Sequence, residues 1–180
     1  SRKNAFSRFP ASPAPMPPGE TPPADGAAPA DAAPATTAFG RFATKGGEVL
    51  LKLDSENGDW RRLPPMAPLG KGDRLLSLPL FRPSIALSTG LSIEPDGAAE
   101  LELAGWTPEG VPIVNVGFGK LLLMTVGKAG NAIQLKLGEQ IAEITFVDAE
   151  SIVAVDVQGK LSPGKDPTKE IAPLAVDLYA

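Results

Sequence analysis

Apolar and polar residues alternate with a period of two along most of the chain after Phe39. This is the spacing of a β-strand with one buried face, because successive side chains point to opposite sides of a sheet. Turn signals separate the runs every ten or so residues, and no long stretch has the helical period. The predicted strands span residues 48–54, 60–63, 75–78, 85–88, 91–94, 99–103, 111–116, 121–126, 133–137, 141–147 and 151–157.

Local details refine this pattern. In the first run we expect Val49, Leu51 and Leu53 to face the core, and the Asn57–Gly58 pair beyond it suits a tight hairpin that leads to the strand at 60–63. Residues 121–124 are apolar at successive positions, which predicts a central strand buried on both faces. Residues 117–120 are interpreted as a turn, and residues 171–179 as either a last strand or a short helix.

The pattern predicts an all-β fold, an antiparallel sandwich or a barrel-like meander of short strands. We assign residues 39–180 to this domain and residues 1–38 to a proline- and alanine-rich arm. A domain of this size buries about two-thirds of its unfolded-chain surface, so its core needs no covalent staples.

Nine of the chain's 20 prolines lie in the arm. Proline fixes φ and removes an amide donor, so we expect a disordered or extended linker with polyproline II character that serves as a spacer. Alternatively, the clusters Pro17–Pro18 and Pro22–Pro23 dock on an aromatic groove of a partner, or the arm lies ordered across another subunit.

Composition excludes several classes of function. The net charge of −4 argues against nucleic acid and anionic membranes as partners, because such binding depends on Lys and Arg. The chain has no cysteine and no histidine, the residues most used for metal binding, nucleophilic attack and proton transfer near neutral pH. We therefore expect no enzymatic activity, no catalytic residues, no cofactor and no metal.

No apolar run approaches the roughly 20 residues of a membrane-spanning helix. The chain begins at Ser1 and shows no signal peptide, so we expect a fragment or a processed product. Membrane association is then expected only through a segment outside this chain.

Four groups of residues are candidates for chemistry. Residues 54–59 carry clustered oxygen ligands, but their glycine and glutamate spacing does not fit an EF-hand. Residues 117–120 contain two glycines and a lysine without the full pattern of a phosphate loop. Paired carboxylates suit glycoside hydrolysis, although alternation with apolar residues favours an exposed face; the available acids are Glu100, Glu102, Glu143, Asp148 and Glu150.

The aromatic residues are the fourth group. Trp60, Trp106 and Tyr179 are candidates for a platform that stacks on sugars, although scattered tryptophans more often pack in or around a core. Trp106 lies between Gly105 and Pro108 in a predicted loop, so it is the better candidate for an exposed partner contact.

The order of several short segments resembles the FecR-like extracytoplasmic domain of bacterial envelope proteins. The segments that carry the resemblance are residues 72–75, 90–93, 96–97, 99–103, 119–121 and 133–147. The chain lacks the family's usual glycine-threonine strand entry and a preceding anti-sigma helical segment, so signalling through a sigma regulator is not carried over. The resemblance implies an all-β, noncatalytic domain in the periplasm or at the cell surface, either free or tethered to the membrane, and protein partners in the envelope.

Three hypotheses follow. The first is a noncatalytic extracytoplasmic β-module that mediates protein–protein contacts, with the arm as spacer. The second is a structural or accessory subunit of a larger complex, bound through the arm. The third is a carbohydrate-binding domain.

Overall fold

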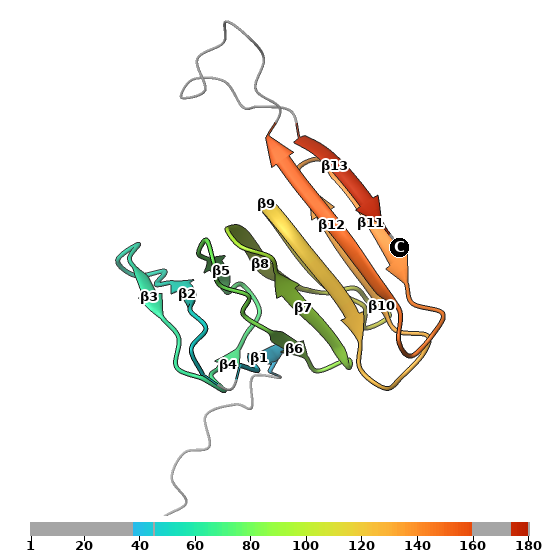
Figure 1. Cartoon of the computed structure of the whole chain (residues 1–180), viewed down its shortest axis with the longest axis horizontal. Coiled ribbons are helices and arrows are strands. Elements are labelled where there is room, and N and C mark those ends of the chain that lie inside the picture. The colour runs from blue at the N-terminus through green and yellow to red at the C-terminus, as the bar shows by residue number, and fades with distance from the viewer. Residues whose placement is uncertain (1–37, 45, 160–173, 180) are drawn as a thin grey trace, which may run out of the picture. The chain divides into compact units, whose positions relative to one another are not determined.

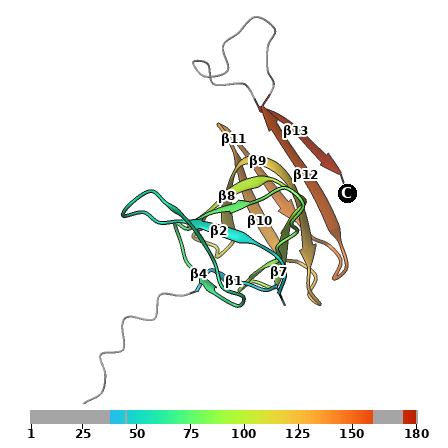
Figure 2. The same cartoon turned by 60° about the vertical axis from the view of Figure 1, so that its left-hand side comes forward.

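The computed structural model describes residues 38–44, 46–159 and 174–179, and these residues form β-strands and no helix (Figure 1). The strands are β1 (Gly40–Phe42), β2 (Leu50–Leu53), β3 (Trp60–Arg62), β4 (Pro68–Leu69), β5 (Arg74–Ser77), β6 (Ile85–Leu87), β7 (Leu91–Pro95), β8 (Ala99–Trp106), β9 (Pro112–Thr125), β10 (Ala132–Leu137), β11 (Gln140–Thr145), β12 (Ile152–Gly159) and β13 (Leu174–Tyr179). They build one curled sheet, a half-barrel that is antiparallel except for one pairing (Figure 2). The predicted all-β, antiparallel fold is confirmed.

Strand β9 organises the sheet because it pairs with four other strands. Its first half pairs with β8 and, in parallel, with β10. Its second half pairs antiparallel with β7 and β12. From β8 the sheet continues through β5 and β2 to β3, and from β7 it continues through β6 and β1 to β4. On the other side, β11 follows β10 and β13 follows β12.

The alternation of buried and exposed residues along β9 shifts by one position in the middle of the strand. Val114 and Val116 are buried in the first half, whereas Leu121 and Leu123 are buried in the second, so the inward positions change from even to odd. A register shift opposite β8 accompanies this change. A strand with such a bulge bends and turns both of its halves toward one core.

The glycine-rich segment 117–120 makes this bend possible, and its interpretation as a turn is wrong, since it lies within β9. Gly119 has a φ of 105°. A Cβ atom at this position would lie 2.5 Å from the carbonyl oxygen of Ala98 and 2.5 Å from the Cβ of Ala99. Only glycine fits this conformation and this close approach.

The first hairpin forms where it was predicted, but its strand faces the other way. Gly58, at φ 75°, closes the turn between β2 and β3. Leu50 is fully buried and pairs with Ser77, whereas Leu51 and Leu53 are only half-buried. The prediction that Leu51 and Leu53 face the core is therefore wrong.

The core fills the concave side of the curled sheet and draws on strands from both halves. Its largest fully buried side chains are Phe39, Phe42, Phe146, Leu50, Leu69, Leu75, Ile85, Leu91, Ile93, Leu101, Leu103 and Leu121. Burial of one such side chain stabilises a fold by about 1.5–3 kcal/mol. The prediction of a central strand at 121–124 is confirmed, since β9 has neighbours on both sides there. Only the face with Leu121 and Leu123 is fully buried, whereas Leu122 and Met124 are half-buried.

Candidate functional site

The proline clusters Pro17–Pro18 and Pro22–Pro23 lie outside the described residues, as does nearly all of the arm assigned to residues 1–38. The hypotheses that the arm is a spacer, or that it binds a partner, therefore stay predictions.

Trp106 ends strand β8, so its placement in a loop is wrong. Its ring lies 4.5 Å from that of Phe39, centroid to centroid, at an angle of 33°. Phe39 is fully buried, and Trp106 is half-buried against the core. Because Trp106 packs against the core and stacks near Phe39, the main role visible for it is packing.

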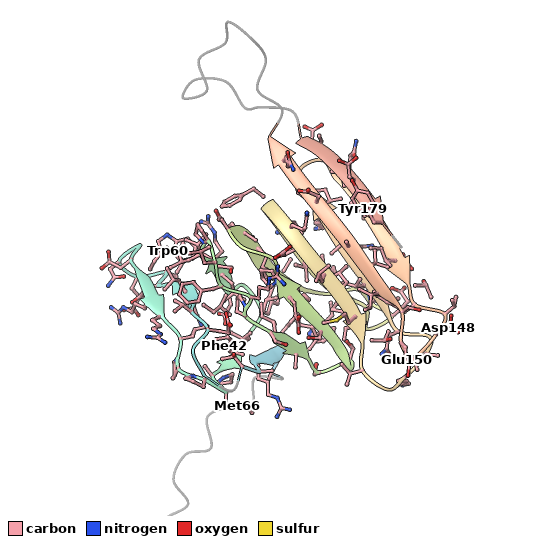
Figure 3. The ribbon with its side chains drawn as sticks, in the orientation of Figure 1. Phe42, Trp60, Met66, Asp148, Glu150 and Tyr179 are labelled. Carbon is pink, nitrogen blue, oxygen red and sulfur yellow. The ribbon has the colours of Figure 1, made fainter. Side chains whose placement is uncertain are left out.

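The three aromatic residues proposed as a sugar platform are not brought together. Trp60 lies on β3, at one end of the sheet, and Tyr179 lies on β13, at the other (Figure 3). Trp106 packs on Phe39 in between. A stacking platform requires neighbouring rings, so these residues do not form one.

The carboxylates of β8 are engaged by neighbours on the same face of the sheet. Glu100 forms an ion pair with Arg74 on β5, and Glu102 accepts a hydrogen bond of 3.0 Å from Nδ2 of Asn115 on β9. The hydrogen bond and the charge of Glu100 raise the pKa of Arg74. The pair is thus a cross-strand polar contact, of the kind that stabilises sheets.

The other acids considered for hydrolysis lie elsewhere. Glu143 is on β11, whereas Asp148 and Glu150 lie in the connection between β11 and β12. Figure 3 labels Asp148 and Glu150 in this connection. Residues 148–151 line an open hollow of about 550 Å³. Glu100 and Glu102 do not contribute to it.

The oxygen-rich segment 54–59 is an ordinary hairpin turn. Oδ1 of Asp54 accepts a hydrogen bond from the amide of Glu56, and Oδ2 of Asp54 lies 2.8 Å from Nη2 of Arg61. Oδ1 of Asn57 accepts a hydrogen bond from the amide of Asp59. Among the residues that the structure describes, no group of acidic residues has the arrangement of a metal site.

A second hollow, of about 460 Å³, lies where the described chain begins. It is lined by Ala38, Gly40, Arg41, Met66, Pro68, Ala86, Leu87 and Ser88. Arg41 is its one charged lining residue, and the rest of the lining is mainly apolar.

Several exposed apolar side chains lie on strands β11, β12 and β13. We call these three strands and the β11–β12 connection the open end of the half-barrel. Ile141 on β11 is 62% exposed, Ile152 on β12 is 55% exposed, and Leu178 and Tyr179 on β13 are 52% and 60% exposed. Val147, in the connection, is also exposed. A contiguous group of exposed apolar residues is a common mark of an interaction surface, and these residues are the candidates for one.

The sheet edges at the open end differ from the other two edges. β3 carries Arg61 and Arg62 and is followed by two prolines, and β4 is two residues long and begins with Pro68. Charged residues, proline and short length are the devices that keep edge strands from pairing with other chains. Strands β11 and β13 are each six residues long and contain no Lys, Arg or Pro, although each contains one acidic residue, Glu143 or Asp177.

No known protein family, curated protein or solved structure matches this chain. The described part of the chain contains no helix that is long and apolar enough to cross a membrane.

Sequence reasoning missed the open end, although a signal for it was present. Residues 174–179 contain apolar side chains on both faces of the strand, as a buried central strand would. Within the described residues, however, β13 pairs only with β12, which leaves part of this apolar surface exposed.

Proposed function

We propose that the chain is a noncatalytic β-module that mediates protein–protein contacts in a bacterial envelope, and that the open end is its contact surface. The observation that carries this proposal is that exposed apolar side chains lie on two six-residue edge strands, each of which pairs with one neighbour among the described residues. Partners can join such edges by adding a strand, with main-chain hydrogen bonds for affinity and side-chain pockets for specificity.

Two further observations support a binding role. The chain has no cysteine or histidine, and the carboxylates of β8 that alternate with leucines are held by Arg74 and Asn115. We also propose a location outside the cytoplasm, because the order of segments resembles the FecR-like domain. Cell fractionation tests it, since the proposal places the native protein with the periplasm or the envelope.

Recovery of partners from the native envelope tests the function. We compare the wild-type chain with the variant Ile141→Ser/Tyr179→Ser, which removes two exposed apolar side chains from the open end. The matched control is Leu80→Ser, since Leu80 is 99% exposed and lies in the loop between β5 and β6.

The proposal predicts that one protein is recovered in constant ratio with the wild type and with Leu80→Ser, and that the double variant recovers about tenfold less. Equal recovery by all three chains contradicts the assignment of the surface. Turnover of a substrate by the purified chain contradicts a noncatalytic role.

A further inference from the structure

Among the described residues, acidic side chains outnumber basic ones in the part of the sheet that includes the open end. Between Val126 and Tyr179, the described residues include six acidic residues, namely Glu139, Glu143, Asp148, Glu150, Asp156 and Asp177, and two basic ones, Lys128 and Lys136. The rest of the described sheet contains four ion pairs, Lys52–Asp73, Arg61–Asp54, Arg74–Glu100 and Arg82–Asp96. At the open end, the only ion pair found among the described residues is Lys120–Asp156.

This single ion pair is long, and it leaves a second acid beside it. Nζ of Lys120 lies 3.9 Å from Oδ2 of Asp156. Asp156 on β12 is the direct cross-strand neighbour of Asp177 on β13. Like charges in opposite positions destabilise a strand pair. A cation placed on the outer side of β13 would therefore stabilise Asp177 and relieve this repulsion.

The two faces of β13 require different neighbours. Val176 and Leu178 pair with Val157 and Val155, whose side chains are buried, so these residues belong to the core side of the sheet. Asp177 and Tyr179 alternate with them and belong to the outer side. A strand added beside β13 therefore meets apolar side chains on the core side and a carboxylate on the outer side.

We propose that β13 accepts an extended segment of another protein as an additional strand, and that this segment alternates apolar residues with Arg or Lys. The apolar residues cover Leu178 and Val176, and a basic side chain pairs with Asp177. This inference rests on the proposed function and adds to it the chemistry of the partner.

A second copy of the chain is a poor occupant of this edge. Self-association through β13 would bring two acidic open ends together, with Asp177 of each copy near the acids of the other. Like-charge juxtaposition of this kind suppresses association. The charge of the open end therefore favours a basic partner over self-assembly.

Peptide binding to the full-length chain tests the inference. The probe is a blocked heptapeptide of alternating valine and arginine, labelled with a fluorophore, and binding is followed by fluorescence anisotropy. A peptide with glutamate in place of arginine tests the charge, and an arginine peptide with a central proline tests the need for a strand. Hydrogen exchange of the amides of residues 174–179, compared with those of residues 60–62, locates the bound peptide.

The decisive variant is Asp177→Lys, which reverses an exposed charge. Its matched control is Glu56→Lys, which reverses an exposed charge in the turn between β2 and β3. We expect the arginine peptide to bind the wild type and Glu56→Lys with similar affinity and to bind Asp177→Lys about tenfold more weakly. The glutamate peptide should show the opposite preference, and both effects should shrink as salt is added.

Three results overturn the inference. They are equal binding of the arginine and glutamate peptides, equal binding to the wild type and Asp177→Lys, and protection of amides other than those of residues 174–179. A sedimentation experiment that shows a dimer of the full chain, dispersed by the arginine peptide, would assign the edge to a second copy and also overturn it. None of these results affects the recovery of an envelope partner, so the inference can fail while the proposed function stands.

Discussion

The substitution Gly119→Ala should be among the most damaging single-methyl additions in the sheet. Gly119 lies at the bend of β9, with a φ of 105°, where an alanine is strained. Backbone strain of this kind costs about 1–3 kcal/mol. The added Cβ would also lie 2.5 Å from the oxygen of Ala98 and 2.6 Å from the Cα of Ala99, both backbone atoms.

Overpacking against backbone costs about another 1–3 kcal/mol, because the neighbouring strand must move as a unit. The two contributions together lower the free energy of unfolding by about 2–6 kcal/mol, a large part of the roughly 5–15 kcal/mol of an ordinary domain. With a urea dependence of about 2 kcal/mol per molar, a loss of 4 kcal/mol lowers the unfolding midpoint by about 2 M.

Urea unfolding followed by circular dichroism measures this loss, with two glycine controls. Gly97 has a φ of 90° and no atom within 4 Å of an added Cβ, so Gly97→Ala introduces the backbone strain alone. At Gly117 the atom nearest to an added Cβ would be 3.6 Å away and φ is not positive. Gly117→Ala should therefore leave the free energy of unfolding unchanged or raise it by up to about 1 kcal/mol. The reasoning is refuted if Gly119→Ala unfolds at the same urea concentration as Gly117→Ala.

Two further predictions concern stability. Trp106→Ala should lower the free energy of unfolding by about 2–4 kcal/mol, because the ring packs on Phe39 and the core, whereas Trp60→Ala on the exposed edge strand should cost less than about 1 kcal/mol; equal losses in urea unfolding would contradict this packing. Leu80→Gly should raise the free energy of unfolding by about 0.5–1 kcal/mol, because Leu80 is 99% exposed and has a φ of 73° in the turn after Pro79; a lower melting temperature of the variant would argue against this strain.

Local alternation predicted most strands but not how they pair. The turn at Gly58 and the core strands at 91–94 and 133–137 follow from nearby residues alone. The parallel pairing of β9 with β10 depends on contacts across the sheet, which no local pattern encodes. β1 and β4 were missed because they are only three and two residues long.

The wrong predictions for β2, β8 and β9 have one physical cause. In each case the local sequence allowed two conformations, and tertiary contacts determined which one formed. Successive leucines at 50 and 51 allow either phase of β2, and pairing with Ser77 selected Leu50 for the core. Gly105 was taken as a loop signal, yet it lies within β8 at a register shift. Gly119 was taken as part of a turn, yet its close approach to Ala98 bends a continuous strand.

The candidate surface was less predictable than the fold. Exposure of Leu178 and Tyr179 depends on which strand lies at the edge, and that is a property of the assembled sheet. The acidic residues of the open end are visible in the sequence, but only the paired strands show that a single ion pair, Lys120–Asp156, forms there among the described residues.

Photo-cross-linking in the native envelope tests the central claim most directly, namely that the open end is the contact surface. A benzophenone amino acid is placed at position 179, on β13, or at position 60, on the opposite edge of the sheet. The account predicts a cross-linked protein partner from position 179 and little or none from position 60. A partner captured from position 60 and not from position 179 would contradict it.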